Sequence, residues 1–190
     1  KSAEISDFKE LTARLSKKPA DGAITKAMVA VKDADGNKVD VEDVTVNKST
    51  VKIKTAKKLA VTGKYTIEIE GMGSQTAIAG ALVRTDAFDK AYAYDGDDLG
   101  ATFKEVRTGF KVWAPTATKV ELVIYKSTDP NAEVDKTIDM TGEDKGVWSA
   151  TVKKLASGTA YSYKLTFADG TVNTSSDPVS YTHLTLPTKR

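Results

Sequence analysis

Phe110-Lys-Val-Trp-Ala-Pro-Thr-Ala117 leads almost directly into Lys119-Val-Glu-Leu-Val-Ile-Tyr125, and both segments show the side-chain pattern of β-strands. The second segment places Val120, Leu122 and Ile124 on one side. A period of two is typical of a strand with one buried face. The proline of the first segment cannot donate to a strand ladder, so we expect that strand to end in a turn there.

The same alternation recurs in both directions along the chain. It is found in the segments Val51–Thr55, Tyr65–Glu70, Trp148–Val152 and Tyr161–Phe167. Asp33-Ala-Asp-Gly-Asn37 predicts a hairpin turn between strands at Ala27–Val31 and Val39–Val46, with Gly36 free to adopt a positive φ. Asp7–Leu15 fits a helix or a strand, and its type stays open. Many short strands separated by turns predict an all-β fold of two tandem immunoglobulin-like β-sandwiches.

Composition excludes several classes of function. The 190 residues carry a formal net charge of +2, with both signs interspersed, which does not indicate a nucleic-acid-binding surface. No apolar run approaches the roughly 18 residues of a membrane-spanning helix, so we expect no membrane insertion. Cysteine is absent, which rules out disulfides and thiolate metal sites, and His183 is the one histidine.

Acidic side chains are the remaining candidates for catalysis or metal binding. The pairs Asp97-Asp98 and Glu143-Asp144 fall in expected turns, where carboxylates are normally solvated. Glycoside hydrolysis needs two opposed carboxylates in a sugar-sized cleft, and no such pair is indicated. The acids of Tyr94–Gly100 fit either a calcium site or a turn that braces the domain joint, and the turn is favoured. We therefore expect no catalytic residue, metal or cofactor in this chain.

Five segments in the same order resemble a known family. They are Tyr94-Asp-Gly-Asp-Asp-Leu-Gly-Ala-Thr-Phe103, Phe110–Ala117, Lys119–Tyr125, Gly146-Val-Trp-Ser-Ala-Thr-Val152 and Ser176-Asp-Pro178. The chain resembles the N-terminal accessory region of type I pullulanases, bacterial enzymes of glycoside hydrolase family 13 that debranch α-glucans. In that family the region includes a carbohydrate-binding module of family 48, which precedes a catalytic barrel. The resemblance implies that this barrel is a partner in the same polypeptide, and that the protein is extracellular or on a bacterial cell surface.

The resemblance also implies a division of the chain. We expect a bacterial immunoglobulin-like accessory domain over residues 1–84 and a family 48-type sandwich over residues 85–178. Val179-Ser-Tyr-Thr-His-Leu-Thr-Leu-Pro-Thr188 looks like a translated sequencing adapter, although its alternation also fits an edge strand. We therefore expect residues 179–190 to be a non-native tail, and the chain to be an excised segment that lacks the barrel.

Three residues are candidates for carbohydrate binding. Tyr125 lies opposite the apolar stripe of its strand, and Lys164 matches a sugar-contacting lysine of glycogen-binding family members. Trp113 is the third, although its family counterpart belongs to a Trp-Ala-Pro turn with a structural role. The two stacking tryptophans of those members are replaced by Val172 and by the loop Lys126–Pro130. The sequence therefore predicts a non-catalytic accessory fragment that binds α-glucan weakly; the alternative is a structural spacer or cell-surface interaction module without glycan binding.

Overall fold

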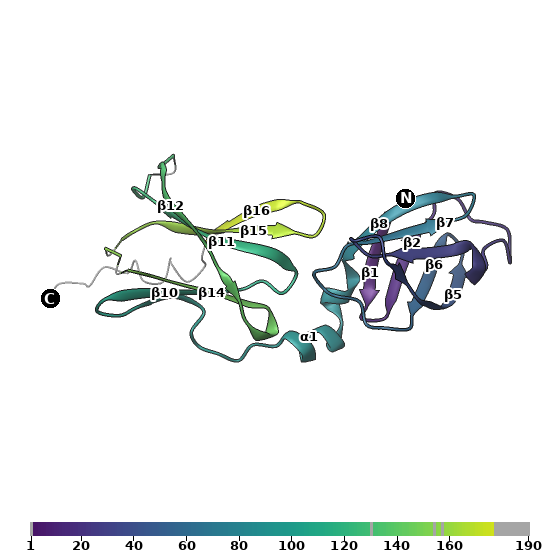
Figure 1. The fold of residues 1–190 in the computed structure, drawn as a ribbon, viewed down its shortest axis with the longest axis horizontal. Coiled ribbons are helices and arrows are strands. Elements are labelled where there is room, and N and C mark those ends of the chain that lie inside the picture. The colour runs from purple at the N-terminus through teal and green to yellow at the C-terminus, as the bar shows by residue number, and fades with distance from the viewer. Residues whose placement is uncertain (1, 130, 154, 157, 177–190) are drawn as a thin grey trace. The chain divides into compact units, whose positions relative to one another are not determined.

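The computed structural model describes residues 2–129, 131–153, 155–156 and 158–176 (Figure 1). Its strands are β1 (Ser2–Asp7), β2 (Glu10–Arg14), β3 (Val29–Lys32), β4 (Lys38–Val39), β5 (Val41–Asn47), β6 (Thr50–Thr55), β7 (Tyr65–Ile69), β8 (Gly73–Ala79), β9 (Gly100–Phe103), β10 (Arg107–Trp113), β11 (Ala117–Tyr125), β12 (Val134–Asp139), β13 (Thr141–Gly142), β14 (Val147–Lys153), β15 (Tyr161–Phe167) and β16 (Val172–Ser176). Helix α1 spans Asp86–Tyr92, and short 3₁₀ turns lie at Lys26–Met28, Ala81–Arg84 and Asp144–Gly146. The all-β fold is confirmed.

The chain divides into two compact units, Lys1–Ala93 and Tyr94–Arg190. The division expected from the sequence falls earlier, after residue 84. The expected tail, residues 179–190, lies outside the described residues.

The first unit is one continuous eight-stranded sheet with the order β4-β3-β7-β8-β1-β2-β6-β5. Strand β1 joins its two halves, because it pairs parallel with β8 on one side and antiparallel with β2 on the other. Buried side chains from both halves, such as Leu11 and Ile53 on one and Val31 and Ile67 on the other, belong to one core cluster. The sheet therefore closes around a single hydrophobic core, as in a sandwich whose two layers share a strand.

Two segments of this unit, Asp7–Leu15 and Val39–Val46, test expectations from the sequence. Asp7–Leu15 forms no helix; it contributes the end of β1 and all of β2, whose buried side chains face the core. The expected strand at Val39–Val46 is wrong as a single element. Lys38–Val39 pairs with β3, whereas Val41–Asn47 pairs with β6. The alternating pattern continues through this change of partner, so periodicity alone did not reveal it.

The first unit ends in a short helix that the sequence did not predict. Thr85 caps α1, because its hydroxyl accepts a hydrogen bond from the Phe88 backbone N–H at 3.2 Å. Phe88 is 2% exposed and stacks on Tyr92 with ring centroids 4.8 Å apart. The apolar spacing of this helix is only one turn long, which is too short to stand out as a helical period.

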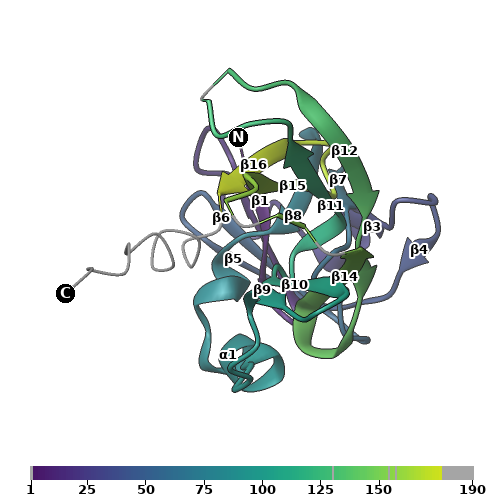
Figure 2. The ribbon, with the colours of Figure 1, turned by 90° about the vertical axis from the view of Figure 1, so that its left-hand side faces the viewer.

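The second unit consists of two four-stranded sheets. One has the order β13-β14-β10-β9 and is called here the β10 sheet; the other, the β11 sheet, has the order β12-β11-β15-β16. Within this unit, Figure 2 shows β11, β12, β15 and β16 in one layer, with β9, β10 and β14 in the other.

The core of the second unit lies between these two sheets. Phe110 of the β10 sheet meets Tyr161 of the β11 sheet edge to face, with ring centroids 4.8 Å apart. Tyr163 is 2% exposed, and Trp148 packs against the same cluster while its Nε1 donates to the Ala114 carbonyl at 3.1 Å. The sequence parity that assigned the large rings of these strands to internal packing is confirmed.

Candidate functional site

Tyr125 and Lys164 lie on the same face of the β11 sheet. Lys164 on β15 pairs in register with Glu121 on β11. Along its strand, each of these three residues alternates with core side chains, such as Leu122 on β11. Glu121, Tyr125 and Lys164 therefore face away from the core. We call the surface formed by Glu121, Tyr125, Ser162 and Lys164 the β11 outer face.

The Tyr125 ring is tied to this face through its hydroxyl. Tyr125 Oη and Ser162 Oγ share a hydrogen bond of 2.9 Å, although the two residues belong to neighbouring strands. Ser162 is only 4% exposed, and Val123, which pairs with it, is only 7% exposed. Because the bond reaches diagonally across the strands, the ring is held along the sheet.

Lys164 is already engaged in an ion-pair network. Its Nζ lies 3.1 Å from Glu121, which also pairs with Lys119 at 3.0 Å. Lys119 in turn contacts Asp139 at 2.8 Å. The hydrogen bonds from Lys119 and then Lys164 lower the pKa of Glu121, and those to Asp139 and then Glu121 raise the pKa of Lys119. Glu121 therefore stays ionised and holds the Lys164 ammonium close to the sheet.

Trp113 lies elsewhere, at the end of β10 in the other sheet. It alternates with the core residues Phe110 and Val112, so it faces outward from the β10 sheet. Its side chain is 42% exposed, and its Nε1 donates to the Lys145 carbonyl at 3.1 Å. The two sheets cover one core from opposite sides, so Trp113 and Tyr125 face in opposite directions. The three candidates do not form one site.

A second charged cluster surrounds Lys111, which shares the outward face of β10. Lys111 Nζ lies 2.8 Å from Asp98 and 3.5 Å from Glu143, and Asp98 also accepts a hydrogen bond from Tyr94. Ser149, opposite Lys111 on β14, donates to Glu143 at 2.5 Å. The hydrogen bond to Asp98 raises the pKa of Lys111, while those from Lys111 and Tyr94 lower the pKa of Asp98.

This cluster does not have the properties of a glycosidase acid pair. A general acid of that reaction needs a raised pKa, whereas the pKa of Asp98 is lowered. Lys111 stands between Asp98 and Glu143 and neutralises part of their charge. Within Tyr94–Gly100, Asp98 thus binds a lysine of the same unit.

Residues 98–180 match the family model described as carbohydrate-binding module 48 (isoamylase N-terminal domain). Over these residues the second unit is similar to carbohydrate-binding modules of family 48. The matched model describes a carbohydrate-binding module and not a catalytic domain.

Several bacterial pullulanases are similar to this chain. A pullulanase of Bacillus subtilis (strain 168) is 45% identical over 73 residues, which is 38% of this chain and 10% of the relative. Pullulanase A of Streptococcus pneumoniae serotype 4 is 30% identical over 120 residues, covering 62% of this chain and 9% of its own length. The crystal structure of pullulanase from Anoxybacillus sp. LM18-11 matches the whole chain and 29% of its own, at 26% identity and a TM-score of 0.68. The chain thus spans about a tenth of these curated relatives.

Two positions of the module distinguish it from the glycogen-binding pattern considered above. Val172 follows the turn where glycogen-binding members have a stacking tryptophan, and it is 48% exposed. In the loop after Tyr125, Lys126 instead pairs with Glu133 at 2.7 Å. Both positions lack an aromatic ring, so the β11 outer face offers Tyr125 as its aromatic surface.

Sequence reasoning did not single out Glu121, Ser162 or Lys111 as parts of these surfaces. Glu121 meets Lys164 through the register of β11 and β15, which no local pattern specifies. The outward parity of Glu121 on its strand was visible, and it is the one signal that could have suggested a polar partner on that face.

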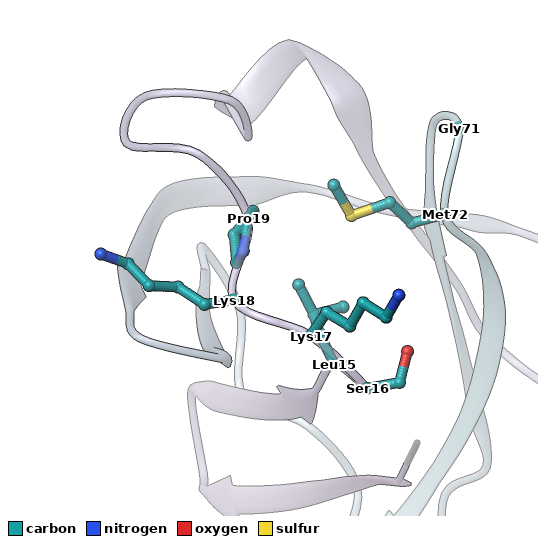
Figure 3. Close-up of a pocket in the computed structure, with 7 residues that line it drawn as sticks. All are labelled: Leu15, Ser16, Lys17, Lys18, Pro19, Gly71 and Met72. Carbon is teal, nitrogen blue, oxygen red and sulfur yellow. The ribbon is translucent and has the colours of Figure 1, made fainter.

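The first unit contains a shallow pocket of about 350 Å³ (Figure 3). It is lined by Leu15, Ser16, Lys17, Lys18, Pro19, Gly71 and Met72. Figure 3 shows Lys17 and Lys18 pointing to opposite sides of the loop, and Lys18 pairs with Asp21 at 3.3 Å. These lining residues include no carboxylate, so the pocket is not the cleft of a glycosidase.

Within the described ranges, no group of three or more His, Cys, Asp or Glu side chains could bind a metal ion. Asp33 accepts backbone hydrogen bonds from Asp35 and Asn37 at 3.0 and 2.8 Å, which is the geometry of a hairpin turn. Among the helices in the described part of the chain, none is long and apolar enough to cross a bilayer.

Proposed function

We propose that this chain is a non-catalytic accessory part of a starch- or pullulan-debranching enzyme. It supports a catalytic barrel in the same polypeptide, which hydrolyses α-1,6-glucosidic bonds, and it binds α-glucan weakly through the β11 outer face. The family of residues 98–180 and the pullulanase relatives support this function. A pullulanase from Anoxybacillus sp. LM18-11 has been solved with maltotetraose, which supports a malto-oligosaccharide as the ligand class.

One observation carries the binding proposal: Tyr125 and Lys164 occupy neighbouring strands of one face, with Ser162 between them. A ring held along the sheet presents its flat surface to the C–H groups of a glucose ring. The Lys164 ammonium then donates to sugar hydroxyls beside it. Tyr125 therefore acts as the stacking platform and Lys164 as the hydrogen-bond donor.

Binding through this face is expected to be weak. Lys164 must share its ammonium between Glu121 and the sugar, so part of each new hydrogen bond replaces an existing one. One tyrosine also offers less stacking area than the two tryptophans of glycogen-binding members.

Affinity electrophoresis in gels that contain pullulan or amylopectin tests the proposal. The native chain should be retarded, and Tyr125→Ala or Lys164→Ala should each weaken the retardation by about threefold or more. Lys54→Ala is the matched control, because Lys54 is also an exposed lysine paired to a glutamate, in the first unit. Retardation that Tyr125→Ala and Lys164→Ala leave unchanged would remove the β11 outer face from glucan binding.

A second function, a structural spacer or cell-surface interaction module without glycan binding, is favoured by the ion pair between Lys164 and Glu121. A lysine fully occupied by this pair would only stabilise the sheet. Unaltered migration of the native chain in both gels supports this second function. Under either function we propose that the protein is extracellular or on the cell surface of a bacterium, since the matched pullulanases come from bacteria.

A further inference from the structure

Strand β16 forms one edge of the β11 sheet (Figure 2). Among the described residues it pairs with β15 alone, in a register that runs without a shift from Val172 to Ser176. All five residues of the strand are exposed. An edge of this kind presents unpaired backbone N–H and C=O groups, which can bond to a further strand.

The other edge strands of the described chain carry features that hinder such pairing. Glu42 and Asp43 place charges on β5, and Asp135 and Lys136 do so on β12; both strands also contain or face a bulge. Strands β4 and β13 have only two residues each, and β9 has four. Strand β16, in contrast, has neither a charged residue nor a proline. It is therefore the edge that is most open to another strand.

The hairpin before β16 determines which of its backbone groups face the open edge. The Phe167 N–H donates to the Thr171 carbonyl at 2.9 Å. In an antiparallel ladder the residues that bond to the neighbouring strand alternate with residues that do not. Every second residue from Thr171 onward therefore bonds to β15. The residues between them, Val172, Thr174 and Ser176, direct their N–H and C=O groups to the open edge.

This arrangement allows β16 to pair with β16 of a second copy. In an antiparallel pair with Thr174 at the two-fold axis, Thr174 exchanges both hydrogen bonds with Thr174 of the second copy, and Val172 lies opposite Ser176. Facing threonines are a favourable cross-strand pair. The Ser176 carbonyl already accepts from the Ser175 hydroxyl at 3.2 Å, so the central threonine supplies the least engaged groups.

Charge does not oppose this pairing. The nearest cation is Lys164, which pairs in register with Thr174 and forms an ion pair with Glu121 at 3.1 Å. Across the axis, the two copies of Lys164 would be separated by three strand spacings, or about 14 Å. This separation exceeds the screening length of about 8 Å at physiological salt. A highly charged partner strand, in contrast, would find no opposite charge on β16.

We propose that two copies of the chain join through β16 and that the resulting pair binds one α-glucan chain through both of its β11 outer faces. The contact merges two four-stranded sheets into one continuous sheet. Its two-fold axis is perpendicular to that sheet, so both β11 outer faces lie on the same side. The glucan part of this inference rests on the proposed function. Linking two weak sites strengthens binding to a polymer without any new contact to the sugar.

The dimer is expected to be weak. Five residues from each copy are far fewer than the roughly 20–30 residues a side of a stable protein interface. Because the two faces are identical and pair with each other, association stops at two copies.

Sedimentation velocity at rising chain concentration tests the dimer. The native chain should approach twice the mass of one chain in the millimolar range. Thr174→Pro removes an N–H that faces the open edge and no bond to β15, so it should weaken self-association about tenfold or more. Thr174→Ala keeps this N–H and should change self-association by less than about threefold. Thr174→Lys, which sets like charges face to face at the axis, is a second disrupting variant.

Amide NMR over the same concentrations locates the contact. The signals of Val172, Thr174 and Ser176 should move as the dimer forms, and those of β5 and β12 should stay in place. Circular dichroism shows whether each variant keeps its fold. In pullulan gels loaded at concentrations that populate the dimer, Thr174→Pro should be retarded about threefold less than the native chain.

Each other outcome has a distinct meaning. A native chain that stays single at every concentration overturns the dimer and leaves the proposed function standing. Self-association whose amide shifts lie outside β16, or that Thr174→Pro and Thr174→Lys leave unchanged, overturns the β16 contact. A β16 dimer in which Thr174→Pro and the native chain are equally retarded overturns the shared grip on glucan. Absence of retardation in the native chain overturns the proposed glucan binding, and with it this use of the dimer.

Discussion

Gly146 occupies a position where a side chain has no room. A Cβ built there would lie 2.3 Å from the Pro115 Cβ, and the residue has a φ of +75°. Its carbonyl accepts a hydrogen bond from the Ala114 N–H at 2.8 Å, so the residue cannot move away without loss of that bond. Two costs therefore fall on any substitution, one from the backbone conformation and one from the clash.

We expect Gly146→Ala to lower the free energy of unfolding by about 3 kcal/mol, which combines left-handed strain with steric repulsion. Gly170→Ala separates the two costs, because Gly170 has a φ of +87° and open space around its Cβ position. That variant should lose only about 1 kcal/mol. Urea unfolding followed by tryptophan fluorescence measures both. Equal losses in the two variants would show that Pro115 moves aside.

The charge on Asp98 leads to a prediction about pH. The hydrogen bonds from Lys111 and Tyr94 lower the pKa of Asp98 below the ordinary value of 3.8, so its ionised form stabilises the fold. This stabilisation is present above pH 3.8 and is lost as the pH falls through the lowered pKa of the folded state.

Asp98→Asn should therefore be less stable than the native chain at about pH 7, and this difference should shrink as the pH falls from about 4 to about 2. Urea unfolding midpoints at the two pH values provide the measurement. Asp97→Asn is the control, because it removes the same charge one residue away. A difference between Asp98→Asn and the native chain that persists at the lower pH would mean that shape, not charge, is what Asp98 contributes.

At the scale of elements, α1 depends on its first residue. Thr85 Oγ1 accepts from the Phe88 N–H, and Phe88 anchors the helix in the core of the first unit. We expect Thr85→Ala to cost about 1 kcal/mol of local stability. Hydrogen exchange should accelerate at the amides of α1 and hardly change in β6. Thr85→Ser retains a capping hydroxyl and should restore slow exchange; equal exchange in all three chains would show that packing of Phe88 alone fixes the helix.

Strands were predictable from the sequence where one face of the strand is buried and the other is exposed to solvent. Tyr65, Ile67 and Ile69 alternate with polar residues, and all three are buried on β7. The sequence was uninformative where this contrast weakens. Val41, Val44 and Val46 of β5 are all partly or largely exposed, and the change of partner between β4 and β5 was not visible in the pattern. Alternation of apolar and polar side chains indicates that one face of a strand is buried, but it does not indicate which neighbouring strand pairs with it.

The candidate site was predictable only in part for the same reason. Parity placed Tyr125 outside the core, and the structure agrees. The pairing of Lys164 with Glu121 depends on the register between two strands separated by a long stretch of sequence. The Lys111 cluster brings together residues from three separate segments, so no spacing in the sequence encodes it.

On the scale of the whole molecule, the described residues form two hydrophobic cores, each built from residues of one unit. Each unit exceeds the roughly 60 residues at which many domains already fold alone. We expect residues 1–93, expressed alone, to give the same amide NMR shifts in β1–β8 as they do in the full chain, apart from the last few residues. Collapse of these shifts into the narrow range of an unfolded chain would show that the first unit requires the second.

The shared strand of the first unit has a consequence for synthesis on the ribosome. Strand β1 lies between β2, which follows it within a few residues, and β8, which ends at Ala79. The hairpin of β1 and β2 can form early, whereas the parallel contact must wait until nearly the whole unit has left the exit tunnel, and non-local pairing of this kind is slow. During this wait one edge of β1 stays unpaired and open to other nascent chains. Within this unit, the strand that is made first is among the last to gain both of its neighbours.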